Sequence, residues 1–187
     1  MGKLLIKNAT VITEGNRLEE DVLIEGEVIS SVSKNIQIDS DTEVIDADGL
    51  ILIPGMIDDQ VHFREPGLTH KGNISSESKA AIAGGVTSYI EMPNTSPNTT
   101  TIEEFNKKIS IASIDSYCNF SFMFGGTNDN LDEIKKIDPT EVAGIKLFLG
   151  SSTGKMLIDN LNSIETIFSS TSLPISAHCE DEQTIKN

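Results

Sequence analysis

The sequence predicts an α/β protein in which an all-β region precedes repeated strand–helix units. Residues 1–52 contain short, β-rich apolar runs separated by turn residues, and they show no helical period. From residue 53 onward, apolar strands alternate with helical patterns, which is typical of a parallel sheet. Polar side chains also gather where these strands end. We therefore expect a β domain over residues 1–52 and strand–helix units over 53–187.

Turn signals divide the β region into strands. Glu25-Gly26-Glu27 separates two apolar runs and predicts a hairpin, and Ala47-Asp48-Gly49 interrupts the last two runs. The expected strands cover residues 4–12, 22–24, 28–32, 43–46 and 50–53.

Helix start and stop signals divide the second region. Gly84-Gly85 suits the end of a helix, and Thr100-Thr101-Ile102-Glu103 matches a capping box that opens another helix. The expected strands cover 56–62, 86–92, 117–124, 144–149 and 174–178; the expected helices cover 75–83, 100–114, 131–137 and 162–169, with a further helix starting within 180–187.

Two parallel architectures fit this pattern, a doubly wound open sheet and a closed eight-stranded barrel. Both place functional groups at the carboxyl ends of the strands. A complete barrel takes roughly 250 residues. If the fold is a barrel, this chain therefore carries about five of its strands and is a portion of it.

Composition excludes several classes of function. The 187 residues carry a net charge of −15, from 29 acidic and 14 basic side chains, which argues against binding to nucleic acid or to an anionic membrane surface. The two cysteines are too few for a disulfide framework and favour a reducing compartment. Residues 1–12 lack the shape of a signal peptide, and no apolar run approaches the ~20 residues of a membrane helix. We expect a cytoplasmic protein.

The first strand of the second region ends in a dense group of functional side chains. Strand alternation predicts that Asp58, Gln60 and His62 share one face. Arg64 and the Pro66-Gly67 turn follow directly, where loop residues can close over a ligand. Side chains able to bind a metal, pointing one way from a strand end, are typical of an active site.

Two later strands add candidates, each with an alternative structural explanation. Lys146 lies in an apolar strand, either with its amine reaching solvent or as a buried amine whose pKa burial lowers. His178 ends its strand, either as a ligand or hydrogen-bonded to backbone. We expect His70 to be a solvated loop residue and Cys179 a buried structural thiol. Residues 150–155 lack phosphate-loop spacing and predict a flexible loop instead.

Together these residues resemble the dihydroorotase family of the amidohydrolase superfamily. The family's Asp-x-His-x-His-x-Arg-Glu-Pro-Gly motif corresponds to residues 58–67, and its Met-Pro-Asn-Thr motif to residues 92–95. Residues 144–146, Gly-Ile-Lys, match the family's fourth-strand lysine, and residues 178–181, His-Cys-Glu-Asp, match its fifth-strand histidine. The resemblance implies part of a small β-sandwich domain followed by an incomplete TIM-like (β/α) barrel, the N-terminal portion of the family's fold.

The resemblance also implies a chemistry. It would be a zinc-dependent cyclic amidase that interconverts dihydroorotate and N-carbamoyl-L-aspartate in pyrimidine biosynthesis. His62 would bind one metal ion, a carbamylated Lys146 would bridge two ions, and His178 would hold the second. Arg64 would pair with the substrate carboxylate, assisted by Asn94. The family's general acid/base, an aspartate of the eighth strand, would lie beyond residue 187, so the chain alone is expected to be inactive.

One departure keeps other functions open. Gln60 stands where the family has its first metal histidine, and an amide oxygen is a weak zinc ligand, so the site would hold one or two ions. A non-catalytic scaffold related to dihydroorotase is therefore one alternative, and a hydantoinase- or allantoinase-like cyclic amidase is another. Expected partners are the small-molecule substrate, further copies of the chain, and aspartate transcarbamoylase.

Overall fold

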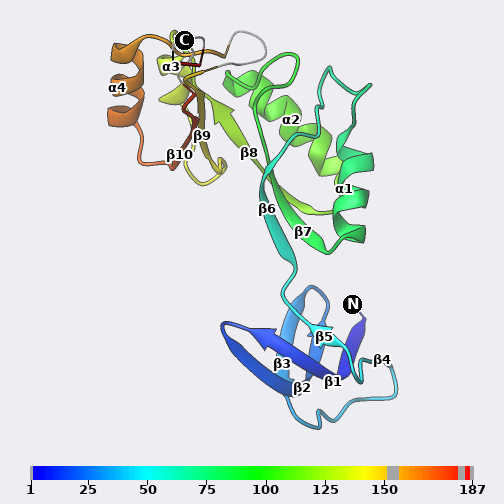
Figure 1. The fold of residues 1–187 in the computed structure, drawn as a ribbon. Helices are drawn as coiled ribbons and strands as arrows, with labels where there is room; N and C mark the ends of the chain where they lie inside the picture. Colours follow the sequence, from blue (N-terminus) through cyan, green and yellow to red (C-terminus); the bar gives the residue numbers. More distant parts are fainter. Residues whose placement is uncertain (1, 151–155, 181–183, 186–187) are drawn as a thin grey trace. The chain divides into compact units, whose positions relative to one another are not determined.

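The chain divides into two compact units, Met1–Pro54 and Gly55–Asn187. The computed structural model describes residues 2–150, 156–180 and 184–185 (Figure 1). The predicted loop over 150–155 and the helix predicted within 180–187 fall largely outside these residues. No helix in the described ranges is long and apolar enough to span a membrane.

The first unit is a mixed β-sheet, which confirms the all-β prediction. Strand order is β3-β2-β1-β4, and β5 also pairs with β1. The meander β1-β2-β3 is antiparallel, while β4 and β5 run parallel to β1. A small cluster formed by Ala9, Val11, Val22 and Ala47 is its core. The strands are β1 (Lys3–Thr13), β2 (Asn16–Glu25), β3 (Val28–Ser33), β4 (Thr42–Asp46) and β5 (Ile51–Leu52).

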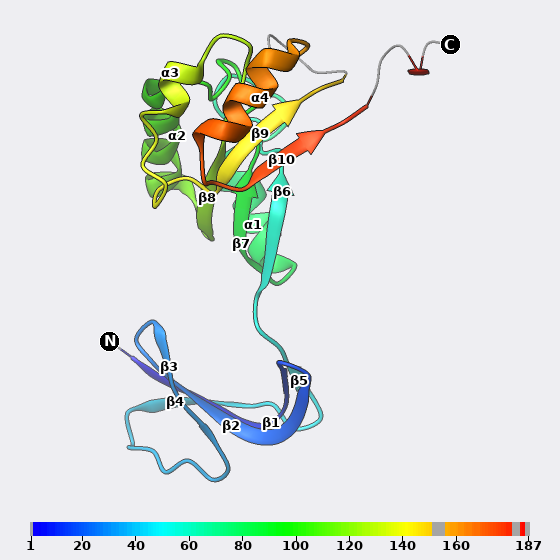
Figure 2. The same ribbon diagram turned by 90° about the vertical axis from the view of Figure 1, so that its left-hand side faces the viewer.

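The second unit contains a five-stranded sheet in the order β10-β9-β8-β7-β6, and every pairing in it is parallel. The sheet curls into a half-barrel with its helices along the outside, as the two views show (Figure 1, Figure 2). Of the two predicted architectures, the incomplete barrel is therefore the one observed. Its elements are β6 (Met56–Val61), α1 (Ile74–Ala83), β7 (Val86–Glu91), α2 (Ile102–Asp115), β8 (Asn119–Gly125), α3 (Leu131–Ile134), β9 (Gly144–Phe148), α4 (Leu161–Ser170) and β10 (Ile175–His178).

Local side-chain chemistry sets the helix boundaries. Helix α1 begins after Asn73, whose side chain accepts from the backbone N–H of Ser76, and it ends at Gly84-Gly85 as predicted. Helix α2 is capped by Thr101, which accepts from the N–H of Glu104. The predicted capping box, which placed Thr100 at the cap, is therefore wrong by one residue, because Thr101 is the hydroxyl that reaches the first turn.

Helix α3 is shorter than predicted, since it ends at Ile134 rather than residue 137. Pro139 disfavours helical geometry in the residue before it. That residue, Asp138, instead accepts hydrogen bonds from the backbone and hydroxyl of Thr140, at 2.9 and 2.7 Å. These hydrogen bonds stabilise a local turn in place of a further turn of helix α3.

The core of the second unit is rich in aromatic side chains, which pack on β7 and β8. Tyr89 is 1% exposed, its ring centroid lies 4.5 Å from that of Phe63, and its hydroxyl donates to Ser116 Oγ at 3.2 Å. Phe122 and Phe124 of β8 are fully buried. The strand ends that carry functional residues therefore rest on a rigid, well-packed base.

The Tyr89→Phe variant is expected to lose less stability than the parent when the pH is raised from 8 to 11. Burial raises the pKa of Tyr89 from 10.0 to about 12. Between these values the unfolded chain releases a proton that the folded chain retains, so stability falls as pH rises from 10 to 12, by up to about 2.7 kcal/mol at 1.36 kcal/mol per unit. Urea unfolding of the complete parent protein and the variant at pH 8 and pH 11 measures this. Equal losses in both proteins would contradict it.

Candidate active site

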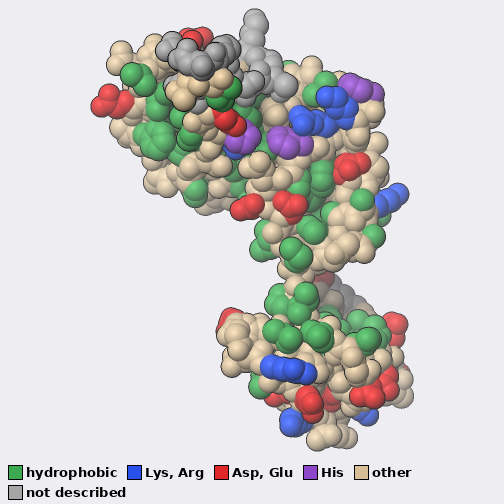
Figure 3. All heavy atoms as spheres, viewed as in Figure 1, with side chains coloured by type: hydrophobic (Ala, Val, Ile, Leu, Met, Phe, Trp, Pro, Cys, Tyr) green, Lys and Arg blue, Asp and Glu red, His purple; other side chains and the backbone are tan. Residues whose placement is uncertain are grey.

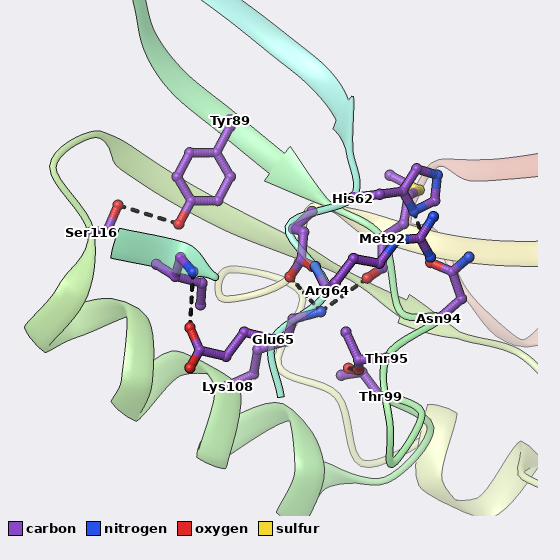
Figure 4. Close-up of polar contacts among 12 residues, drawn as sticks. His62, Arg64, Glu65, Tyr89, Met92, Asn94, Thr95, Thr99, Lys108 and Ser116 are labelled. Carbon is purple, nitrogen blue, oxygen red and sulfur yellow. Dashed lines mark hydrogen bonds and ion pairs between the residues drawn. The ribbon is translucent and has the colours of Figure 1, made fainter. Parts of the chain in front are cut away.

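The loops after β6 and β7 bring His62 and Asn94 into direct contact. The distance between His62 Nδ1 and Asn94 Oδ1 is 2.9 Å (Figure 4). An amide oxygen can only accept, so this bond requires the proton on Nδ1 and leaves the Nε2 lone pair of His62 available. Within the described ranges, no residue hydrogen-bonds to the amide nitrogen of Asn94, which can therefore donate to a ligand.

The electrostatic surroundings of His62 favour a neutral imidazole. Burial is the largest cause that lowers its pKa, and the positive charge of Arg64 is the next. Lys146 and His178 lower it further, while the bond to Asn94 opposes these effects. Residues of four strands or of the loops that follow them therefore contribute to the electrostatic surroundings of His62, and Figure 3 shows His side chains gathered with Lys and Arg side chains in this unit.

Arg64 projects from a strained backbone toward the same space as His62 and Asn94 (Figure 4). Its φ of 70° lies in the left-handed region that non-glycine residues rarely adopt. Its backbone N–H donates to Glu91 Oε1 at 3.1 Å. Among the described residues, no carboxylate forms an ion pair with its guanidinium. A guanidinium without an ion-pair partner, on a backbone held in a strained conformation, is suited to bind an anionic ligand.

Lys146 is buried, with 1% of its surface exposed, so the explanation that its amine reaches solvent is wrong. Burial lowers the pKa of the amine, with Glu180 and Cys179 opposing the shift. Its Nζ lies 5.4 Å from the ring centroid of Phe148, and in the described part of the chain no oxygen accepts a hydrogen bond from it. A buried amine with a lowered pKa and no acceptor is suited to react as a nucleophile.

His178 closes β10 beside the same phenylalanine. Its ring centroid is 5.3 Å from that of Phe148, in an edge-to-face arrangement. Strand pairing sets Ser176 opposite Lys146 and His178 opposite Phe148. The Phe148 ring therefore lies beside both candidate ligands.

Gln60 is placed less favourably than the other candidates. Its side chain is exposed, and its backbone N–H donates to Asp58 Oδ1 at 3.1 Å. The pairing of β6 with β7 is irregular between Asp58 and Val61, so strand alternation does not extend simply to His62. Among the residues that the structure describes, Gln60 forms no hydrogen bond with the other predicted ligands. Its role as a ligand stays a prediction.

The donor set fits a divalent metal ion in its chemistry. His62 offers a free Nε2, His178 a second imidazole, and Lys146 an amine that carbamylation would convert into an anionic two-oxygen ligand. No three His, Cys, Asp or Glu side chains in the described ranges cluster as a metal site on their own. Metal binding by this set would therefore depend on carbamylation of Lys146.

The loops of the site approach each other closely at Gly67. A Cβ added there would overlap the carbonyl oxygen of Ser96, and the φ of Gly67 is 83°. The N–H of Ser96 also donates to the carbonyl of Pro66 at 3.1 Å. The loop that carries Arg64 is thereby fastened to the loop that carries Asn94.

Gly67→Ala is expected to destabilise the fold more than Gly85→Ala. Both glycines have positive φ, 83° and 88°, but nothing lies within 4 Å of a Cβ at Gly85. The shared backbone strain costs about 1–2 kcal/mol, and the overlap at Gly67 adds roughly 1–3 kcal/mol. Denaturant unfolding of both variants in the complete protein measures the difference. Equal losses would show that the two loops separate freely.

The structure also reveals two residues that sequence reasoning missed, Glu91 and Lys108. They form a buried ion pair beneath the site, with Nζ and Oε2 2.6 Å apart. A glutamate within the apolar run of β7, and a lysine between Phe105 and Ala112 on the buried face of α2, were the available signals. His70 is exposed as expected. Cys179 is exposed, so the prediction of a buried thiol is wrong, because it follows a strand at the open edge of the sheet.

Comparison with known proteins identifies the family of the chain. A dihydro-orotase-like family model matches residues 49–187. The dihydroorotases of Methanosarcina acetivorans and Aquifex aeolicus are 33% and 35% identical over 98% of this chain, which spans 40% and 44% of their lengths. An L-hydantoinase (dihydropyrimidinase) from Arthrobacter aurescens superposes with a TM-score of 0.92 at 28% identity, over 100% of this chain and 42% of its own. The chain belongs to the dihydro-orotase-like family.

Proposed function

We propose that the complete protein containing this chain is a metal-dependent cyclic amidase. It reversibly hydrolyses dihydroorotate to N-carbamoyl-L-aspartate in pyrimidine biosynthesis, in the cytoplasm. The observation that carries the proposal is the convergence of His62, Arg64 and Asn94, with a guanidinium that has no ion-pair partner among the described residues. Family membership and dihydroorotase relatives at 33–35% identity support it.

In this proposal each residue has a separate task. Arg64 binds the carboxylate of dihydroorotate through a bidentate contact, and the Asn94 amide nitrogen donates to the same group. His62, held by Asn94 with its Nε2 free, His178 and carbamylated Lys146 hold one or two zinc ions, and Gln60 would be a weak additional ligand. Bound zinc would supply Lewis-acid chemistry at the ring carbonyl. We assign no general acid or base among the described residues.

The wider organisation is part of the proposal. Residues 1–52 would form the N-terminal part of a small β domain, and residues 53–187 the first five strand–helix units of the hydrolase barrel. Homo-oligomers, and association with aspartate transcarbamoylase, are proposed partners beside the small-molecule substrate.

Two other functions have a specific observation in their favour. The exposed Gln60 in place of a metal ligand favours a non-catalytic scaffold. The TM-score of 0.92 with an L-hydantoinase (dihydropyrimidinase) favours a cyclic amidase with another ring as substrate. In this proposal Arg64 binds a carboxylate that hydantoin and dihydrouracil lack, and this favours dihydroorotate over those rings as the substrate.

One experiment separates these functions. The complete protein is purified, its zinc content is measured, and ring opening of dihydroorotate, hydantoin and dihydrouracil is followed. The proposal expects one or two zinc ions per chain and a kcat/KM highest for dihydroorotate. A protein that holds no metal and opens no ring would be a scaffold, and preference for an uncharged ring would assign it to the hydantoinase-like class.

A further inference from the structure

A buried ion pair lies directly beneath the candidate site. Glu91 ends β7 and Lys108 lies in the middle of α2, and their side chains are 1% and 0% exposed. Desolvation of two charges consumes most of the attraction between them, so apolar side chains of similar size often give equal stability. Stability alone therefore does not explain why this core contains two charges.

Glu91 holds the backbone from which Arg64 projects. While Oε2 faces Lys108, Oε1 accepts the Arg64 N–H at 3.1 Å. The φ of Arg64 is 70°, a conformation that persists only where surrounding contacts impose it. Glu91 supplies that contact.

Lys108 holds the other loop. Its Nζ donates to the carbonyl oxygen of Met92 at 2.9 Å, two residues before Asn94 (Figure 4). The same Nζ lies 5.0 Å from the ring centroid of Phe122, so protein atoms fill its surroundings. One ammonium thus links the Glu91 carboxylate to the backbone that leads into the Asn94 loop.

We propose that the Glu91–Lys108 pair is a positioning element that sets Arg64 and Asn94 at the spacing required to bind one carboxylate. This proposal rests on the proposed function. Arg64 is held through its N–H and Asn94 through the Met92 carbonyl, and the ion pair joins the two restraints. Neither Glu91 nor Lys108 is a catalytic residue, since both act through the residues that they hold.

Lys107 provides a matched control on the same helix. It forms ion pairs with Glu103 and Glu104 at 2.8 and 2.9 Å, but its side chain is 54% exposed. Exposed pairs of this kind contribute little to stability. Among the described residues, the ammonium of Lys107 pairs only with these two glutamates, so Lys107→Met changes a neighbouring lysine without removing a hydrogen bond or ion pair to either loop.

The decisive variant replaces both charges, Glu91→Leu with Lys108→Met, in the complete zinc-loaded protein. We expect cooperative unfolding to be retained, hydrogen exchange at the Arg64 amide to accelerate at least tenfold, and KM for dihydroorotate to rise at least tenfold with kcat within threefold. A rise in KM at constant kcat indicates the loss of a binding interaction that the substrate and the transition state share equally. Lys107→Met is expected to match the parent in all three measurements.

The outcomes separate this proposal from the proposed function. A folded double variant with parental KM and slow Arg64 exchange overturns the positioning role. If the parent does not open dihydroorotate, the proposed function fails, and the exchange measurement alone decides the positioning role.

If the double variant does not fold, Glu91→Gln with Lys108→Met replaces it. That variant keeps an acceptor for the Arg64 N–H and loses the hydrogen bond to the Met92 carbonyl. Its KM for dihydroorotate should rise at least threefold, and hydrogen exchange should accelerate at the Asn94 amide but not at the Arg64 amide. A parental KM in this second variant overturns the proposal.

Discussion

Lys146→Met is expected to abolish zinc retention and to slow dihydroorotate hydrolysis by about 10³-fold or more, while the fold remains at least as stable. The loss follows from the proposed site, in which only a carbamylated lysine supplies the anionic ligand. Lewis-acid stabilisation is worth several kcal/mol of the reaction barrier, and each 1.36 kcal/mol is about tenfold in rate.

The stability expectation has a separate cause. Lys146 is 1% exposed, has its pKa lowered by burial, and has no hydrogen-bond acceptor in the described part of the chain. Methionine has similar length and no polar atom to desolvate, so it suits the same apolar surroundings. A loss of activity without a loss of stability would separate a functional lysine from a structural one.

Three measurements check this prediction on the complete protein. Zinc content is determined after dialysis, thermal unfolding reports stability, and incorporation of ¹³C-labelled bicarbonate reports carbamate formation. The parent should take up the label and Lys146→Met should not, while Lys107→Met serves as a surface control. A Lys146→Met protein that keeps parental zinc and activity would exclude the lysine from the metal site.

The topology explains why the strands that carry the candidate residues could be predicted to end along one edge of the sheet. Parallel strands present their carboxyl ends at one edge of a sheet, so residues as far apart in sequence as His62 and His178 were expected to meet once strand–helix repeats were recognised. Strands β6 to β10 pair in parallel in chain order, and Lys146 and His178 both help to lower the pKa of His62. A repeating pattern sufficed for this because it fixes strand direction.

The contacts between elements were not predictable in the same way. The Glu91–Lys108 pair depends on how α2 rotates and slides over the sheet, and neither motion is encoded in local periodicity. The cap of α2 was misplaced by one residue for a related reason. Thr100 and Thr101 are chemically equivalent as caps, and only the three-dimensional path of the loop selects Thr101.

Arg64→Met is expected to lower kcat/KM for dihydroorotate by roughly 10–100-fold, mainly through KM. A hydrogen bond to a charged group contributes about 1.5–3 kcal/mol, which corresponds to that range. Rings without a carboxylate, such as hydantoin, should be affected far less. Arg64→Lys should give an intermediate value, because an ammonium keeps the charge and cannot form the bidentate contact. Steady-state kinetics on both rings measure the contrast, and equal losses on both would mean that Arg64 does not bind the carboxylate.

Arg64→Gly tests whether function or stability selects the arginine. Glycine adopts a φ of 70° without strain, so this variant should gain up to about 1 kcal/mol of stability in denaturant unfolding while it loses the same affinity as Arg64→Met. The backbone N–H that Glu91 accepts is unchanged in glycine. If arginine costs stability at this position but improves substrate binding, then the binding role of its side chain explains why a strained residue is present. If Arg64→Gly proves less stable than the parent, the guanidinium has a structural role that the described contacts do not contain.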